Sequence, residues 1–91
     1  MPRLEFSERF VEDFALVESP RLEARVLADL DNIAAFGEFG SANLPESIKL
    51  SFGSEVRKVA VNPFDLIYSF YPERDLVRIE ALVHQRAAWW L

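Results

Sequence analysis

The chain has 91 residues, the size of one domain, and 51% of them are hydrophobic, which excludes a disordered chain. It contains no cysteine, so disulfides, thiolate zinc sites and thiol catalysis are excluded. The net charge of −5 argues against a strongly basic nucleic-acid-binding protein. No apolar run approaches the roughly 20 residues of a membrane span, and the acidic first twenty residues are unlike a signal peptide. We therefore expect a soluble, cytoplasmic domain with no membrane partner.

Charge is distributed unevenly along the chain. Residues 1–46 hold four basic and ten acidic side chains, whereas residues 47–91 hold six basic and five acidic ones. Any anion-binding surface should therefore come from the second half. The alternative is that the first half is simply helical, with its carboxylates on solvated faces.

The first segment, residues 1–37, begins with a predicted strand and a short helix. Arg3–Phe6 alternates polar and apolar side chains, as a strand does. Ser7 can cap a helix that runs to about Val17, with Glu8 in its first turn. The apolar residues of this helix, Phe10, Phe14 and Val17, are spaced to form one stripe.

A second, longer helix is predicted to follow. Ser19 suits its N-cap, Pro20 suits its first position, and Gly37 is expected to end it. Its apolar stripe consists of Leu22, Val26, Leu30 and Ile33. Because only two or three residues join the two helices, we expect them to fold back as a hairpin.

The second segment, residues 38–55, is predicted to be an irregular connection. Gly40, Pro45 and Gly53 interrupt any regular pattern, although a short helical turn around residues 45–50 fits the sequence. Four apolar residues, Leu44, Ile48, Leu50 and Phe52, indicate that the segment is pinned to the core.

The third segment, residues 56–91, predicts a three-stranded meander and a C-terminal tail. The strands are Val56–Val61, Phe64–Tyr71 and Leu76–His84, separated by turns at Asn62-Pro63 and at residues 72–75. Alternation in the last strand predicts one face made of Val77, Ile79, Ala81 and Val83, and an opposite face made of Arg78, Glu80 and His84.

These segments predict a single α+β domain over residues 1–91 with the order β-α-α-β-β-β. The N-terminal strand and the helical hairpin should pack on the antiparallel C-terminal meander, the hairpin covering one face of the sheet. The other face would then be open to a partner.

Three short motifs follow one another in the last third of the chain: RKVAV at 57–61, NPFDLIY at 62–68 and VRIEALVHQR at 77–86. Together with the strand and hairpin before them, they resemble the RelE/ParE superfamily of toxins from bacterial type II toxin–antitoxin modules. The resemblance extends over nearly the whole chain and implies a toxin domain. It also implies a protein antitoxin that wraps an extended or helical segment around the toxin.

The resemblance implies two different activities. One branch of the superfamily resembles ribosome-dependent endoribonucleases that cut mRNA, called mRNA interferases, and the other resembles inhibitors of DNA gyrase that act by binding. The target is accordingly the ribosome with its mRNA, or DNA gyrase. Exposed sheet edges would also allow a homodimer through sheet extension.

RNA cleavage through the 2′-hydroxyl needs proton-transfer groups and cations for the phosphate charge. His84 is the single histidine, and an imidazole titrates in the range that proton transfer requires. We therefore take His84 and Arg86 as the candidate catalytic pair, on one face if the strand persists that far. Further candidates for binding RNA or another target are Lys49, Arg57, Lys58, Arg78 and the stacking residues Trp89 and Trp90.

Structural alternatives exist for these residues. His84 could be hydrogen-bonded to Glu80 or to a backbone carbonyl, and Arg57 could pair with Asp65 across the hairpin. Asp65 stands where the nuclease branch carries an arginine, and a carboxylate there would repel a phosphate. The two lysines could simply be solvated. No motif for a metal or a cofactor is present.

Three functions remain open from the sequence. The first is a toxin that inhibits growth by binding a topoisomerase or the ribosome, which the loss of the nuclease-type arginine at Asp65 favours. The second is an mRNA interferase that uses His84 and Arg86. The third is a non-toxic binding domain derived from this superfamily, which the net charge of −5 favours.

Overall fold

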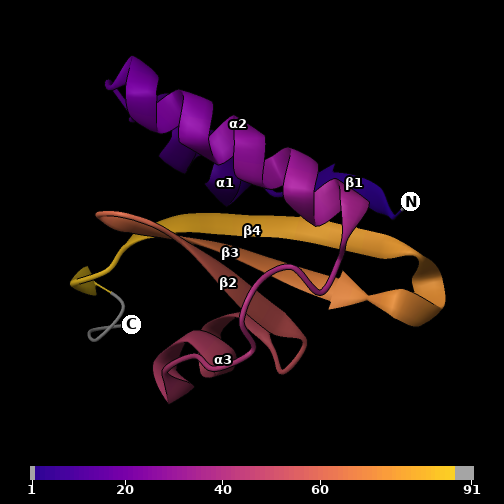
Figure 1. The fold of residues 1–91 in the computed structure, drawn as a ribbon. Coiled ribbons are helices and arrows are strands. Elements are labelled where there is room, and N and C mark those ends of the chain that lie inside the picture. The colour runs from indigo at the N-terminus through magenta and orange to yellow at the C-terminus, as the bar shows by residue number, and fades with distance from the viewer. Residues whose placement is uncertain (1, 88–91) are drawn as a thin grey trace.

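The computed structural model describes residues 2–87 as a four-stranded sheet with helices on both faces (Figure 1). The elements are β1 (Arg3–Phe6), α1 (Glu8–Ala15), α2 (Pro20–Ala35), α3 (Glu46–Phe52), β2 (Val56–Val61), β3 (Phe64–Tyr71), a 3₁₀ turn (Pro72–Arg74) and β4 (Leu76–His84). None of the helices within residues 2–87 is long and apolar enough to cross a membrane.

The sheet order is β1-β4-β3-β2. The three C-terminal strands pair antiparallel as the predicted meander, and β1 adds to β4 in parallel. The outer edge of β2 is paired at one point, where Lys58 and Ser41 exchange two backbone hydrogen bonds of 2.9 Å. The predicted α+β class and element order are confirmed.

The helix caps follow from the local sequence. The Ser7 hydroxyl accepts a hydrogen bond of 3.0 Å from the Phe10 backbone N–H, and Ser19 caps α2 in the same way through Leu22. Helix α1 ends at Ala15 and α2 at Ala35, two residues before the predicted ends at Val17 and Gly37. The four residues between them allow the hairpin (Figure 1).

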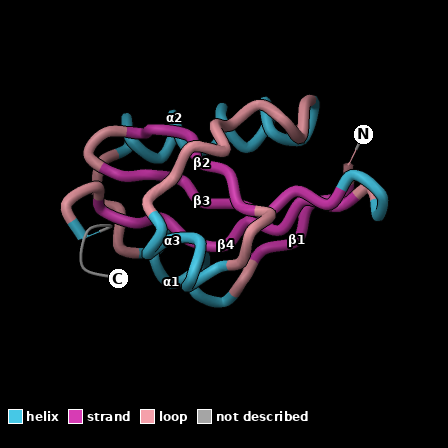
Figure 2. Tube along the Cα trace, turned by 90° about the horizontal axis from the view of Figure 1, so that it is seen from below, coloured by secondary structure: helices cyan, strands magenta, loops and turns pink. Residues whose placement is uncertain are grey.

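Two hydrophobic clusters lie on opposite faces of the sheet. The larger one joins the apolar stripes of α1 and α2 to the sheet and includes Phe10, Val26, Leu30, Ile33, Val61, Leu66, Tyr68, Val77, Ile79 and Leu82. The smaller one lies under α3 and its preceding loop and consists of Leu44, Ile48, Val56, Ile67, Ala81 and Val83, with Phe52 packed against it. Figure 2 views the sheet from the α3 side. The second face of the meander is therefore partly covered.

A β-bulge at Glu80 explains how β4 serves both clusters. Tyr68 pairs with Ile79 but the preceding residue, Ile67, pairs with Ala81, so Glu80 is an extra residue in β4. The predicted single face of Val77, Ile79, Ala81 and Val83 is therefore wrong. Val77 and Ile79 belong to the larger cluster, Ala81 and Val83 belong to the smaller one, and the face changes between them.

Helix α1 seals the edge of β4 beyond the end of β1. The Ser7 hydroxyl donates to the Glu80 carbonyl at 2.6 Å, and the Asp13 carboxylate accepts from the Leu82 backbone N–H at 3.0 Å. The Arg9 guanidinium lies 5.2 Å from the centre of the Phe52 ring, so α1 also contacts α3. Polar groups at an otherwise open strand edge are thereby satisfied.

The loop after α2 is fixed by the buried hydroxyl of Tyr68. It donates to the Gly37 carbonyl at 2.8 Å and accepts from the Gly40 backbone N–H at 2.6 Å. A Cβ at Gly40 would lie 2.7 Å from the Lys58 carbonyl oxygen, so the loop approaches β2 too closely for any other residue. Burial raises the pKa of Tyr68 above its ordinary value of 10.0.

Replacing Tyr68 by phenylalanine should lower the free energy of unfolding by about 1–3 kcal/mol, because the Gly37 carbonyl and the Gly40 N–H lose their buried partner. Urea denaturation of both proteins measures the difference. Tyr71→Phe is the matched control and should change the stability by less than about 0.5 kcal/mol. Equal effects of the two substitutions would contradict the role given to the Tyr68 hydroxyl.

The raised pKa of Tyr68 also predicts a dependence on pH. The unfolded tyrosine ionises first, so this part of the stability is present below pH 10.0 and is lost as the pH rises through the folded pKa. The free energy of unfolding of the wild type should fall more steeply above pH 10.0 than that of Tyr68→Phe. Parallel curves for the two proteins would refute the assignment.

Candidate functional site

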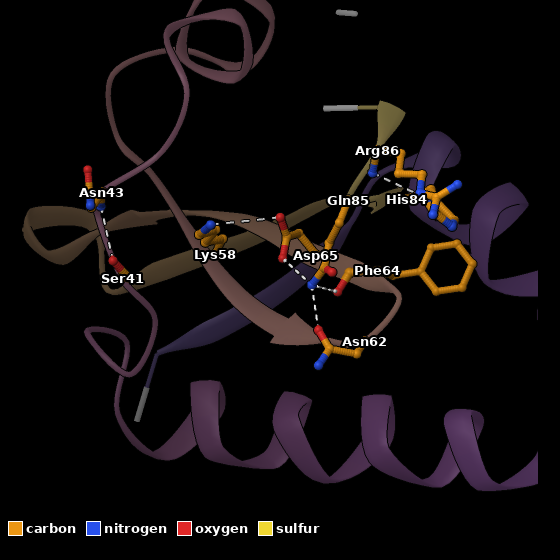
Figure 3. A network of polar contacts seen from close by, with 9 residues as sticks. All are labelled: Ser41, Asn43, Lys58, Asn62, Phe64, Asp65, His84, Gln85 and Arg86. Atoms are coloured by element: carbon orange, nitrogen blue, oxygen red, sulfur yellow. Dashed lines mark hydrogen bonds and ion pairs between the residues drawn. The ribbon is translucent and has the colours of Figure 1, made fainter. Parts of the chain in front are cut away.

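Gln85 is the centre of a polar network where the β2–β3 turn meets the end of β4 (Figure 3). Its Nε2 shares two hydrogens among the Asn62 Oδ1 at 2.6 Å, the Phe64 carbonyl at 3.3 Å and the Asp65 Oδ1 at 3.3 Å. Its backbone N–H donates to the Pro63 carbonyl at 2.9 Å. These bonds fix the direction in which the chain leaves the sheet.

Asp65 lies inside this network on the face of the sheet opposite α2. Its carboxylate is 3.9 Å from the Lys58 ammonium, and the two side chains are 9% and 31% exposed. Lys58 and Asp65 share this face because Asp65 pairs with Ala60, two residues after Lys58. The positive charge of Lys58 is therefore directed to an internal carboxylate.

The predicted pairing of Arg57 with Asp65 is wrong. Arg57 points to the other face of β2, where its guanidinium donates to the Gly40 carbonyl at 2.7 Å and weakly to the Glu38 carbonyl at 3.4 Å. Arg57 thus holds the loop after α2 against the sheet. This contact supports the structural alternative to a phosphate-binding role.

His84 is exposed at the last position of β4, and its surroundings differ from both structural alternatives. Its ring and the Phe64 ring form a T-shaped pair with centroids 5.5 Å apart, and its Nδ1 accepts a hydrogen bond of 3.1 Å from the Arg86 backbone N–H. The Glu80 carboxylate is instead bonded to Ser69 and Arg78. An accepting Nδ1 leaves Nε2 to carry the proton of the neutral ring.

Arg86 lies in the turn after β4 and is exposed. Since the strand ends at His84, the two candidate catalytic residues do not share a strand face, but the Arg86 backbone bonds to the His84 ring. Among residues 2–87, no carboxylate lies within 4.0 Å of the Arg86 guanidinium. No carboxylate of residues 2–87 therefore neutralises the charge of Arg86.

None of the remaining sequence candidates bonds to this network within residues 2–87. Arg78 is six residues before the end of β4, about 20 Å along the strand, and pairs with Glu5 at 3.6 Å and Glu80 at 3.1 Å. Lys49 lies half-buried on α3. Trp89 and Trp90 lie outside the described residues. Within residues 2–87, no three acidic or histidine side chains converge to hold a metal.

Two arginines of the acidic first half reach the same end of the molecule, which the sequence analysis missed. Arg21 and Arg25 on α2 line a hollow of about 210 Å³ whose other lining residues are Ser19, Leu22, Asn62 and Pro63. Their i, i+4 spacing places them on one side of the helix. The sequence did not reveal that this side faces the β2–β3 turn.

The fold is similar to that of solved toxin–antitoxin proteins from E. coli. The chain matches the intact RelBE toxin–antitoxin complex with a TM-score of 0.69 and 15% identity, over 92% of this chain and 96% of that chain. It matches the toxin RelE bound to an antitoxin RelB peptide with a TM-score of 0.66 and 14% identity, over 98% of this chain and 92% of that chain. It matches the DinJ–YafQ complex with a TM-score of 0.62 and 23% identity, over 96% of this chain and 97% of that chain.

No protein-family model matches the chain, and no curated protein is significantly similar to it in sequence. At 14–23% identity, the structural matches establish a shared fold. The fold implied by the resemblance to the RelE/ParE superfamily is therefore confirmed. The site residues stay predictions, to be tested by substitution.

The Lys58–Asp65 contact can be tested by a double-mutant cycle. Lys58→Met should lower the free energy of unfolding by about 1–2 kcal/mol, because the mostly buried Asp65 carboxylate loses its cation. Asp65→Asn in the same background should restore most of this loss, and urea denaturation of the four proteins measures it. Additive effects, within about 0.5 kcal/mol, would show that Lys58 is free to bind a ligand.

Proposed function

We propose that the chain is the toxin of a type II toxin–antitoxin module and is neutralised by a protein antitoxin. The observation that carries this proposal is the match to RelE and YafQ, which spans 92–98% of the chain and 92–97% of the solved proteins. These proteins were solved in complexes with the antitoxins RelB and DinJ. A match of this extent supports a whole toxin domain.

The target that we propose is the translating ribosome. The structural matches are to RelE and YafQ, and the resemblance to the RelE/ParE superfamily includes its ribosome-dependent branch. The described site supports an anionic target, since Arg86 has no carboxylate partner within residues 2–87 and His84 is exposed beside it. A bound phosphate would meet both side chains as the chain leaves the sheet.

We propose further that the chain acts mainly by binding. Strand cleavage moves one proton from the 2′-hydroxyl and another to the leaving 5′-oxygen. Among the described residues of this site, His84 is the one imidazole, and the Asp65 carboxylate is held by Lys58 and Gln85. The site therefore offers a cation and one proton-transfer group, which is enough to hold an RNA phosphate.

The second candidate is an mRNA interferase that uses His84 and Arg86. The observation that favours it is the position of the imidazole, whose Nδ1 is fixed by the Arg86 backbone while Nε2 has no partner among residues 2–87. In that case His84 would accept the proton of the 2′-hydroxyl as its oxygen attacks the phosphorus. Arg86 would stabilise the charge that develops on the phosphate oxygens.

Expression of the chain alone in a bacterium should arrest growth and protein synthesis, and co-expression of the neighbouring small gene should relieve the arrest. Arg86→Ala should weaken target binding about tenfold and relieve most of the arrest, because it removes one charge-assisted phosphate contact. The control is Arg74→Ala, which removes an equal charge from an arginine that lies over Tyr71. Growth curves and labelled amino-acid incorporation measure both effects.

The same cells distinguish the alternatives. Absence of arrest at comparable expression would refute the toxin assignment and favour a non-toxic binding domain. Arrest with gyrase-dependent double-strand breaks and continuing translation would identify a topoisomerase as the target. Mapped cuts in translated mRNA that disappear with His84→Gln would establish the interferase, whereas arrest that persists in His84→Gln with intact mRNA supports action by binding.

A further inference from the structure

The hollow between α2 and the β2–β3 turn is a basic surface outside the candidate catalytic pair. We call it the α2 arginine surface and define it by Arg21, Arg25 and Asn62. Its other lining residues, Ser19, Leu22 and Pro63, are uncharged, and its volume is about 210 Å³. Both arginines are exposed, and within residues 2–87 no carboxylate lies within 4.0 Å of either guanidinium.

Most other cations of the described chain are engaged by the protein itself. Arg9 pairs with Asp13, Lys58 with Asp65, and Arg78 with Glu5 and Glu80, while Arg57 binds two carbonyls and Arg74 lies over Tyr71. Of the arginines within residues 2–87 that have no ion pair, ring contact or side-chain hydrogen bond, Arg21, Arg25 and Arg86 lie around the β2–β3 turn, and Arg3 lies at the opposite end, beside Leu76. Two like charges at i, i+4 also destabilise a helix by about 0.2–0.5 kcal/mol, which an anion between them would relieve.

The α2 arginine surface adjoins the candidate site. Asn62 lines the hollow, and its Oδ1 accepts the 2.6 Å hydrogen bond from Gln85, the residue between His84 and Arg86. The first turns of α2, the β2–β3 turn and the end of β4 lie at the same end of the molecule (Figure 1). A strand bound at Arg86 can therefore continue across the turn to the two arginines.

We propose that the α2 arginine surface binds backbone phosphates of the RNA strand that Arg86 contacts. Arginine forks suit phosphate oxygens, and the Asn62 amide keeps its two N–H donors for the same ligand. Leu22 and Pro63 supply apolar walls against which a ribose or a base can pack. This inference rests on the proposed ribosomal target and adds a contact that positions the RNA without taking part in any chemistry.

The test is the salt dependence of binding to a fluorescently labelled single-stranded RNA oligonucleotide, measured by anisotropy. Each phosphate contact contributes about 0.7 to the slope of log K against log salt concentration. Arg21→Gln with Arg25→Gln should reduce the slope by about 1.4, the loss of two contacts. The control combines Arg3→Gln with Arg74→Gln, which changes the net charge equally at the opposite end, and should leave the slope within about 0.5 of the wild type. Circular dichroism checks that the four substitutions leave the fold intact.

Three results would overturn the inference: no measurable binding of the wild type at low salt, an unchanged slope in the Arg21/Arg25 variant, or equal losses in both variants. Poly-L-glutamate serves as a second probe. If the Arg21/Arg25 variant loses affinity for it while its RNA slope is unchanged, the surface binds an acidic protein and the inference is wrong. If the wild type arrests growth but the Arg21/Arg25 variant keeps the wild-type salt slope, the proposed function stands and the inference about the α2 arginine surface is wrong. If the variant's salt slope is reduced but the wild type does not arrest growth, only the proposed function is overturned.

Discussion

The extra residue in β4 is the constraint on which the rest of the structure depends. The Glu80 carbonyl is bonded by Ser7, and its carboxylate is bonded by Ser69 at 2.8 Å and Arg78 at 3.1 Å, so the bulge is held on both sides. It reverses the alternation of β4, which lets Leu82 join the core under α1 and α2 while Ala81 and Val83 pack under α3. It also sets the register that brings Gln85 next to Asp65.

Much of the fold could be predicted from local sequence signals. Ser7 and the Ser19-Pro20 pair mark the helix starts through capping, which acts within one turn. The three C-terminal strands follow from the turns at Asn62-Pro63 and at residues 72–75 that separate them. The face of β4 could not be predicted, because a bulge changes the register without leaving a signal in the strand itself. The role of Gln85 depends on three acceptors more than 19 residues away, and such contacts exist only in the folded chain.

The distribution of charge shows the same division between local and long-range information. Counting charges along the chain predicted that the second half supplies any anion-binding surface, and Arg86 remains the strongest candidate there. However, folding directs Arg57, Lys58 and Arg78 to internal partners and brings Arg21 and Arg25 from the acidic half to the β2–β3 turn. A protein of net charge −5 can thus present a local basic surface, because the exposed Arg21 and Arg25 lie together while other cations are paired within the fold.

The proposed function requires this end of the sheet to contact ribosomal RNA or mRNA. Sedimentation of the purified chain with translating ribosomes through a sucrose cushion tests that claim most directly. We expect the chain to pellet with ribosomes at low salt, to be released as the salt concentration rises, and to pellet much less when Arg86 is replaced by alanine. A chain that stays in the supernatant at every salt concentration, while it is captured by purified DNA gyrase, would contradict it.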